Sequence, residues 1–253
     1  MLFRSLIEPF AVAPFVFTAA ALGAWIAGHL TAAFGPPMPM TPSVAPGVVL
    51  ALLLLIANDF AYFLAHYLEH RIPLLWEFHK VHHSAPVLIP PTALRLHPVD
   101  EIGQKLFVAL STAAVSGAFL YLYPVGVTEV TVAGLNAYFL SRLLIFYKLR
   151  HSHLPLRFSP LLEAMVISPA MHQLHHSNNP RHYDRNFGLQ FAIWDRMFGT
   201  LMLSDAEPIS ELGLSNGEHL AYNGLLALYC LPFVKVFRRY AASAMGRAVA
   251  PRR

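Results

Sequence analysis

Two long stretches without a charged residue constrain the fold of this chain more than any other feature of its sequence. The run from Pro9 to Asn58 contains no Asp, Glu, Lys or Arg, and a second such run covers residues 106–128. A helix needs about 20 apolar residues to cross the hydrocarbon core of a bilayer. The composition agrees, because 56% of the residues are hydrophobic and 13% are charged, against roughly 25% charged in an ordinary soluble domain. The sequence therefore predicts an integral membrane protein.

Prolines and glycines divide these apolar stretches into helices. Proline cannot continue a helix, so the five prolines between residues 36 and 46, and later Pro124 with Gly126, predict two tight turns. A helix on each side of a turn satisfies its own backbone hydrogen bonds, as lipid requires. We expect an all-α fold in which residues 1–253 form a single membrane domain of two helical hairpins. The four expected spans are 9–30, 47–66, 105–123 and 127–147.

The basic residues predict the orientation of these spans. None of the 18 Lys and Arg residues falls in either turn, so the positive-inside rule places every basic segment and both termini in the cytoplasm. A cytoplasmic cap of residues 66–100 and 148–205 follows. A weaker apolar run at 220–234 is expected to be an interfacial or buried helix, because a fifth span would export the six bases after it. The lack of a plain retrieval signal favours a bacterial inner membrane.

Histidines gather in four short segments of the expected cap. His66 and His70 are four residues apart, the pattern H-x-x-H-H occurs at 79–83 and at 172–176, and His151-Ser-His153 follows the last span. Residues three and four apart lie on one face of a helix, so each such segment directs imidazoles into one volume. Unpaired buried imidazoles at this density would be costly, and protonated ones would repel. The spacing therefore predicts a site for two metal ions.

The lone cysteine and the isolated histidines narrow this interpretation. Imidazole suits Fe, Zn, Cu or Ni, whereas a single cysteine, Cys230, excludes zinc ribbons and self-supplied iron–sulfur clusters. His29, His182 and His219 stand alone and are expected to be structural. His97 is expected either to bind metal or to support a ligand.

The histidine motifs resemble those of the fatty acid hydroxylase and sterol desaturase superfamily of integral-membrane di-iron oxygenases. The resemblance covers about residues 55–200. It rests on Asp59 with His66-x-x-x-His70, on the segment from Trp76 to Ser84, on the segment from His172 to Gly188, and on the closing stretch from Trp194 to Thr200. It implies two Fe ions, which Zn can replace in a purified sample, with O2 as oxidant. The target would be an aliphatic C–H bond of a lipid or sterol-like substrate, which is hydroxylated or desaturated.

The resemblance also implies the metal ligands, which are the catalytic groups. They are His66, His70, His79, His82, His83, His151, His172, His175 and His176. In the third segment, members often have a His followed by Ser and Asn, so His151 is the expected ligand and His153 is in doubt. A ligating histidine usually donates its other N–H to a carboxylate or carbonyl. The residues considered for this supporting role are Asp59, His97, His153, Asp184, Asn186 and Asp195.

The remaining expectations concern partners and rival functions. The sequence has no cysteine cluster, dinucleotide fingerprint or haem module, so a separate electron donor of ferredoxin or cytochrome type is expected. Nucleic acid is not expected as a partner, because the bases form no stripe with interleaved aromatics. His66-Tyr-Leu-Glu69-His70 also fits the zinc-peptidase pattern H-x-x-E-H, with Glu69 as general base. A membrane metal or haem carrier is a second alternative, whereas the absence of any Glu-x-x-His pair disfavours a carboxylate di-iron protein.

Overall fold

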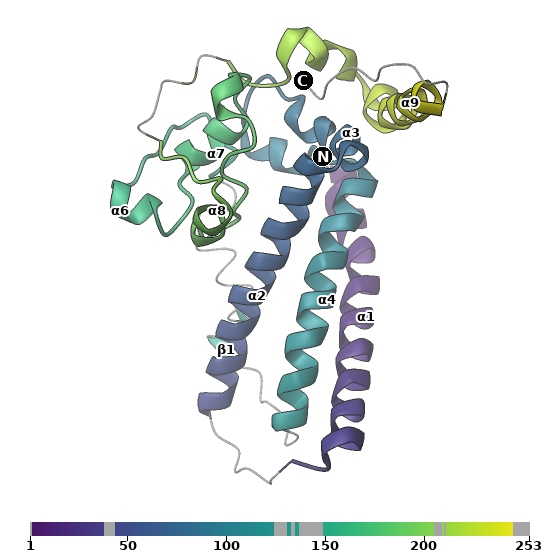
Figure 1. Ribbon diagram of the computed structural model, residues 1–253, viewed down its shortest axis with the longest axis vertical. Helices are drawn as coiled ribbons and strands as arrows, with labels where there is room; N and C mark the ends of the chain where they lie inside the picture. The colour runs from purple at the N-terminus through teal and green to yellow at the C-terminus, as the bar shows by residue number, and fades with distance from the viewer. Residues whose placement is uncertain are drawn as a thin grey trace. The chain divides into compact units, whose positions relative to one another are not determined.

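The chain is mostly helical and forms two compact units (Figure 1). The computed structural model describes residues 2–37, 44–123, 131–132, 135–136, 149–204, 209 and 211–244. The first unit combines Met1–Tyr62 with Gln104–Ile145, and the second combines Phe63–Gly103 with Phe146–Arg253.

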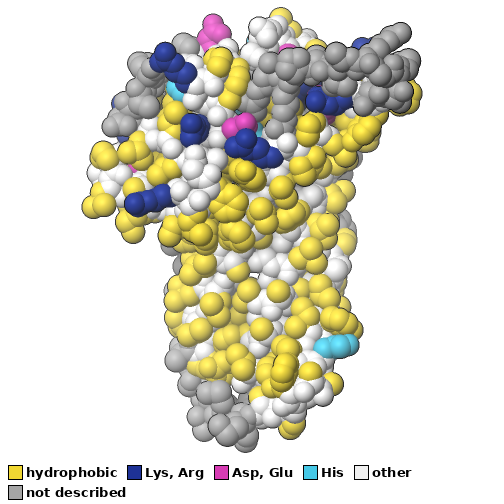
Figure 2. Space-filling model, in the orientation of Figure 1, with side chains coloured by type: hydrophobic (Ala, Val, Ile, Leu, Met, Phe, Trp, Pro, Cys, Tyr) yellow, Lys and Arg dark blue, Asp and Glu magenta, His cyan; other side chains and the backbone are white. Residues whose placement is uncertain are grey.

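Among the residues that the structure describes, three helices are long and apolar enough to cross a membrane, which supports a membrane protein. They are α1 (Leu2–Phe34), α2 (Val44–Arg71) and α4 (Pro98–Leu122). Their candidate spanning segments are Pro14–Phe34, Pro46–Arg71 and Pro98–Leu122. Large apolar side chains face outward along them, and Figure 2 shows hydrophobic side chains over the visible face of these helices. Exposed apolar side chains are compatible with lipid, because the acyl chains around them are equally apolar.

Small residues let α1 and α4 approach each other closely within the first unit. Ala19, Ala109 and Ala113 form a buried cluster. A Cβ added at Gly117 would lie 2.7 Å from the carbonyl oxygen of Gly23, so no larger residue fits there without movement of the backbone. Helices in lipid associate through such small-residue contacts, since apolar burial alone gives them little net attraction.

The observed helices extend beyond the spans expected from charge-free runs. The helix α4 begins at Pro98, seven residues before the expected span, and carries Asp100 and Glu101 in its first turn. Carboxylates there are favourable because the N-terminus of a helix carries partial positive charge. The helix α2 continues past the span to Arg71, so that His66 and His70 lie on one helix as predicted. A change in polarity therefore marks where lipid-compatible sequence ends, but not where the helix ends.

The fourth expected span, 127–147, lies mostly outside the described residues. Within it, β1 (Thr131–Val132) and β2 (Leu135–Asn136) pair as antiparallel strands, with Thr131 opposite Asn136. The β-branched Thr131 and Val132 suit an extended backbone. These four residues therefore form strands, whereas we expected them to be helical.

Short helices and connecting loops make up the second unit. They are α3 (Pro73–His83), η1 (Pro90–Leu94), α6 (Pro160–Glu163), α7 (Pro169–His175), η2 (Pro180–His182), α8 (Ile193–Phe198), η3 (Ser215–Tyr222) and α9 (Leu225–Ala244). The start of α7 is fixed by Ser168, whose hydroxyl accepts a hydrogen bond from the Met171 N–H at 3.1 Å, and by Pro169 as first helical residue. Glu163 accepts hydrogen bonds from the hydroxyls of Ser168 and Ser204, each at 2.6 Å, which ties α6 to the segments around it.

The C-terminal helix differs from the expected segment 220–234. The chain forms η3 up to Tyr222, and α9 then begins at Leu225 and runs to Ala244, with Pro232 inside it. Leu228 and Leu231 of α9 pack against a buried cluster that includes Trp76 of α3. The helix continues past the predicted end because Lys235 and Arg239, which we took to follow the apolar run, pair with Glu218 and Glu77.

Candidate metal centre

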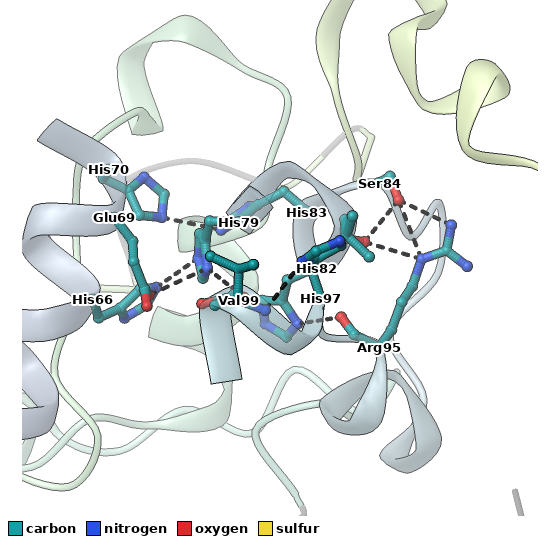
Figure 3. Close-up of polar contacts among 12 residues, drawn as sticks. His66, Glu69, His70, His79, His82, His83, Ser84, Arg95, His97 and Val99 are labelled. Carbon is teal, nitrogen blue, oxygen red and sulfur yellow. Dashed lines mark hydrogen bonds and ion pairs between the residues drawn. The ribbon is translucent and has the colours of Figure 1, made fainter. Parts of the chain in front are cut away.

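Two helices supply five of the histidines in the second unit. His66 and His70 lie one turn apart at the end of α2, and His79, His82 and His83 occupy the last turn and a half of α3. Figure 3 shows the side chains of His66 and His70 directed toward those of α3. Pro73 begins α3 immediately after α2 ends, so a short connection folds the second helix back against the first.

The later segments bring four more histidines to the same region. His151 follows the undescribed stretch, His172 and His175 belong to α7, and His176 caps the end of that helix. All nine expected ligands are buried, each with at most 5% of its surface exposed. Potential ligand atoms of these nine fall into two groups, each within 4.8 Å of one another. The first group is His66, His70, His79, His83 and His175, and the second is His82, His151, His172 and His176.

Several pairs of Nε2 atoms within each group lie about 3 Å apart. In the second group, the Nε2 atoms of His82 and His151 are 3.1 Å apart, those of His151 and His172 are 2.9 Å apart, and those of His172 and His176 are 3.1 Å apart. In the first group, the pairs His66–His79 and His70–His83 are each 3.1 Å apart. Two nitrogens bound at right angles to an ion at about 2.1 Å would be about 3.0 Å apart.

The hydrogen bonds of the Nδ1 atoms show which ring nitrogen of His66 and of His79 carries a proton. The Nδ1 of His66 donates to the carbonyl oxygen of Phe187 at 2.9 Å, and the Nδ1 of His79 donates to the carboxylate of Asp100 at 3.2 Å. Because these oxygens can only accept, the Nδ1 atom of each ring carries a proton, and each Nε2 is directed inward, where it could bind a cation.

Burial favours the neutral form of several of the expected ligands. It is the largest cause that lowers the pKa of His82 from 6.5 to about 3, followed by the neighbouring His79. Burial together with the adjacent imidazoles also lowers the pKa values of His83, His151, His172 and His176 well below the usual range. A neutral imidazole is the form that binds metal.

The second group also carries buried nitrogens whose usual partners are missing. The Nδ1 atoms of His151, His172 and His176 have no hydrogen-bond partner among the described residues. A buried polar atom without a partner is costly, and binding of the inward nitrogens to a shared cation would offset that cost. The donor chemistry and the distances thus fit two metal ions, one in each group.

A family model decides the classification. The fatty acid hydroxylase model matches residues 51–200, which is more than half of the chain and includes all nine histidines.

This chain belongs to the fatty acid hydroxylase family.

Curated relatives include the alkylglycerol monooxygenase of Caenorhabditis elegans, which is 25% identical over 194 residues, or 77% of this chain. The ornithine lipid hydroxylase of Rhizobium tropici is 26% identical over 79% of this chain, and the alkylglycerol monooxygenase of Danio rerio is 30% identical over 56%. The matches cover 35%, 53% and 28% of these relatives, so the chain spans about half of their length or less. No solved structure matches this chain.

Three carboxylates lie beside rings of the expected ligands. His79 Nδ1 lies 3.2 Å from Asp100 Oδ2 and 3.3 Å from Glu69 Oε2, and His70 Nδ1 lies 3.5 Å from Asp184 Oδ1. Asp184 was among the expected supports. Asp100 was missed, because an acidic residue two positions after a proline resembles an ordinary helix start. Glu69 was considered only as a peptidase base.

Backbone carbonyls support three further rings. The Nδ1 atoms of His66, His82 and His175 donate to the carbonyls of Phe187 (2.9 Å), Arg95 (3.3 Å) and Arg185 (2.7 Å). No sequence pattern could have indicated them, since every residue has a carbonyl group. Such bonds fix the ring orientation and the tautomer of a ligating histidine.

Asp195 and Asn186 act on the loop that carries the Phe187 carbonyl. The Asp195 carboxylate accepts from the N–H groups of Phe187 (2.8 Å) and Gly188 (2.7 Å) and from the Thr200 hydroxyl (2.6 Å). The side chain of Asn186 forms hydrogen bonds with backbone groups of Met171 and Met202. Neither residue touches a histidine through these bonds, so they differ from the direct supports that we expected and shape the loop instead.

Three expected supporting residues lie elsewhere. His97 accepts from the Val99 N–H at 3.1 Å and donates from Nε2 to the Tyr229 carbonyl at 3.2 Å, which links it to α9 rather than to the histidine groups. His153 is exposed, and Asp59 is buried in α2 but belongs to none of the ligand groups found among the described residues.

Asp100 offers a direct test of ligand support. Replacing Asp100 with alanine removes the acceptor that holds His79, and we expect metal affinity to fall about 10–100-fold. Metal retained during titration with a chelator measures this loss. Glu101→Ala changes the next residue, which belongs to none of the described ligand groups, and should retain metal as the unaltered protein does. Equal retention by the two variants would contradict the role of Asp100.

Proposed function

We propose that this protein is an O2-dependent di-iron hydroxylase that acts on an aliphatic C–H bond of a lipid. The observation that carries the proposal is the convergence of nine buried imidazoles in two groups. The net reaction would convert R–H, O2, two electrons and two protons into R–OH and water. Iron bound by the two groups would supply the activation of O2.

The residues of the chain would prepare the site for this chemistry. His66, His70, His79, His83 and His175 would hold one ion, and His82, His151, His172 and His176 the other. Carboxylates and carbonyls at Nδ1 would keep each Nε2 available. Burial of every ring excludes bulk water, which protects reactive groups from side reactions. A cavity beside His70, His83 and His175, lined also by Lys80 and Glu218, would give small polar molecules a path to the first group.

The names of the relatives and the apolar helices favour a lipid as substrate. Two of the relatives named above are alkylglycerol monooxygenases and one is an ornithine lipid hydroxylase. Desaturation would begin with the same removal of hydrogen, so substrate placement would decide between the two outcomes. Electrons would come from a separate ferredoxin- or cytochrome-type donor, and the histidine-bearing unit would face the cytoplasm.

Isotope labelling tests the proposed reaction. Membranes that contain the protein and a reducing system are incubated with 18O2, and their lipids are compared with those of membranes lacking it. We expect one 18O atom in a hydroxylated lipid. His176→Ala should abolish this product, whereas His29→Ala should not, because His29 is an exposed residue of α1. A hydroxylated product without 18O would contradict the proposal. The absence of product with every electron donor tried, while metal remains bound, would contradict it and favour a carrier.

Glu69 distinguishes this proposal from a zinc peptidase. A peptidase of the H-x-x-E-H type needs the Glu69 carboxylate as base and would lose all activity in Glu69→Gln. Here Glu69 lies 3.3 Å from the Nδ1 of His79, beside Asp100, and the glutamine oxygen can still accept that hydrogen bond. We therefore expect Glu69→Gln to keep a large part of its hydroxylase activity, measured as lipid product per bound metal. Complete loss at full metal content would oppose our assignment.

A further inference from the structure

The helix α9 has its polar and apolar sides reversed relative to a helix on a water-exposed surface. Its outer side carries an exposed apolar stripe, which is Leu226, Tyr229, Cys230, Phe233, Phe237 and Tyr240. These positions follow the spacing i, i+3, i+4, i+7, i+11 and i+14, so they share one face of the helix. Leu226 is 82% exposed and Phe237 is 75% exposed. A contiguous apolar stripe of this kind marks an interaction surface.

The opposite side of α9 turns Lys235 and Arg239 toward the protein, whereas Arg238 is exposed. Lys235 donates hydrogen bonds to Glu218 and to the hydroxyl of Tyr222, and Arg239 lies 3.9 Å from Glu77 of α3. Leu228 and Leu231 complete this inward face. These contacts fix the rotation of α9, so its apolar stripe cannot turn inward without breaking ion pairs.

Several observations identify lipid as the occupant of this stripe. The described part of the chain has three helices able to cross a bilayer, and α9 is not among them because Lys235, Arg238 and Arg239 interrupt its apolar character. No acidic residue occurs in α9 to repel a phospholipid surface. Tyr229 and Tyr240 suit the boundary between acyl chains and headgroups, where amphipathic aromatic rings are enriched. A helix with these properties lies on a membrane instead of spanning it.

We propose that the apolar stripe of α9 inserts into the bilayer surface and anchors the histidine-bearing unit there. The stripe would lie about 5–10 Å deep, at the boundary of headgroups and acyl chains. Because α9 packs on α3, which carries three of the expected ligands, the anchor would hold that helix beside the membrane from which a lipid substrate comes. The insertion itself does not depend on the proposed reaction.

The single cysteine of the chain allows a direct test. Cys230 is exposed and lies within the stripe, so the full chain can be labelled there with an environment-sensitive fluorophore without a substitution. The labelled protein is reconstituted in phosphatidylcholine vesicles that contain brominated acyl chains, and iodide is added as the aqueous quencher. We expect the brominated lipid to remove most of the emission and iodide to remove little.

Matched labels give the test its controls. Arg181→Cys in a Cys230→Ser background places the same fluorophore on η2, where iodide should quench it and brominated lipid should not. Leu226→Cys in that background should behave as Cys230 does, because it lies one turn earlier on the stripe. Strong iodide quenching at both stripe positions would show that water covers α9. Protection from both quenchers would show a protein contact, such as a second copy. Either outcome would overturn the proposal.

Discussion

Replacing His151 with alanine is expected to reduce bound metal from about two ions to about one per chain and to abolish lipid hydroxylation. His151 is central to the second group, since its Nε2 lies 3.1 Å from that of His82 and 2.9 Å from that of His172. Loss of residues that merely support ligands costs about 10–100-fold in affinity or activity, so loss of a ligand should exceed 100-fold. Elemental analysis of protein purified without a chelating tag measures the metal content.

The same segment provides the matched control for this experiment. His153 is two residues from His151 but is exposed and lies outside both histidine groups. His153→Ala should therefore keep both its metal and its activity. If His153→Ala lost metal while His151→Ala retained it, the assignment of the third segment would be reversed. If neither variant lost metal, the second group would not be a metal site.

Replacing Asp195 with alanine should lower the free energy of unfolding by about 3–5 kcal/mol, because each buried donor left without a partner costs about 1–3 kcal/mol. The change would strip acceptors from the N–H groups of Phe187 and Gly188 and from the Thr200 hydroxyl. Burial raises the pKa of the Asp195 carboxyl and these three hydrogen bonds oppose that rise, as expected for an enclosed acceptor. Thermal unfolding in detergent micelles should show a markedly lower midpoint.

The Asp195 variant should also disturb the metal centre at a distance. The Phe187 carbonyl that Asp195 positions is the partner of His66 Nδ1, so the folded fraction of Asp195→Ala should release metal to a chelator faster. Glu211→Ala removes an exposed carboxylate that bonds Asn178 at 2.8 Å, and such surface changes usually alter stability by less than about 0.5 kcal/mol. An unfolding midpoint for Asp195→Ala equal to that of Glu211→Ala would refute this role.

The sequence predicted the membrane helices better than their ends. Charge-free runs indicate lipid-compatible segments, and three of the four expected spans coincide with helices. The ends were displaced because a helix continues through charged residues that stabilise it, as α4 does at Asp100 and Glu101. At α9 the interpretation of charge was misleading in another way, since Lys235 and Arg239 face the protein. Charge in a sequence does not reveal on which side of a helix its partner lies.

Spacing also predicted which histidines gather, but not how they divide between the two groups. The intervals of three and four residues place His79, His82 and His83 on one helix end, yet His82 joins the second group while its neighbours join the first. That division depends on contacts such as the one between His82 and His151, which are 69 residues apart. Local periodicity carries no information about such pairs. The sequence also could not indicate the backbone carbonyls that accept hydrogen bonds from the Nδ1 atoms of three histidines.

The helix α2 combines a segment able to cross the membrane with two histidines of the first group. One uninterrupted helix, Val44–Arg71, contains a segment able to cross the bilayer and ends in His66 and His70. Membrane helices respond to a mismatch with bilayer thickness by tilting, and any tilt of α2 would displace these two imidazoles from their three partners. Acyl-chain length and sterol content of the host membrane would therefore become determinants of how well the first histidine group holds its ion.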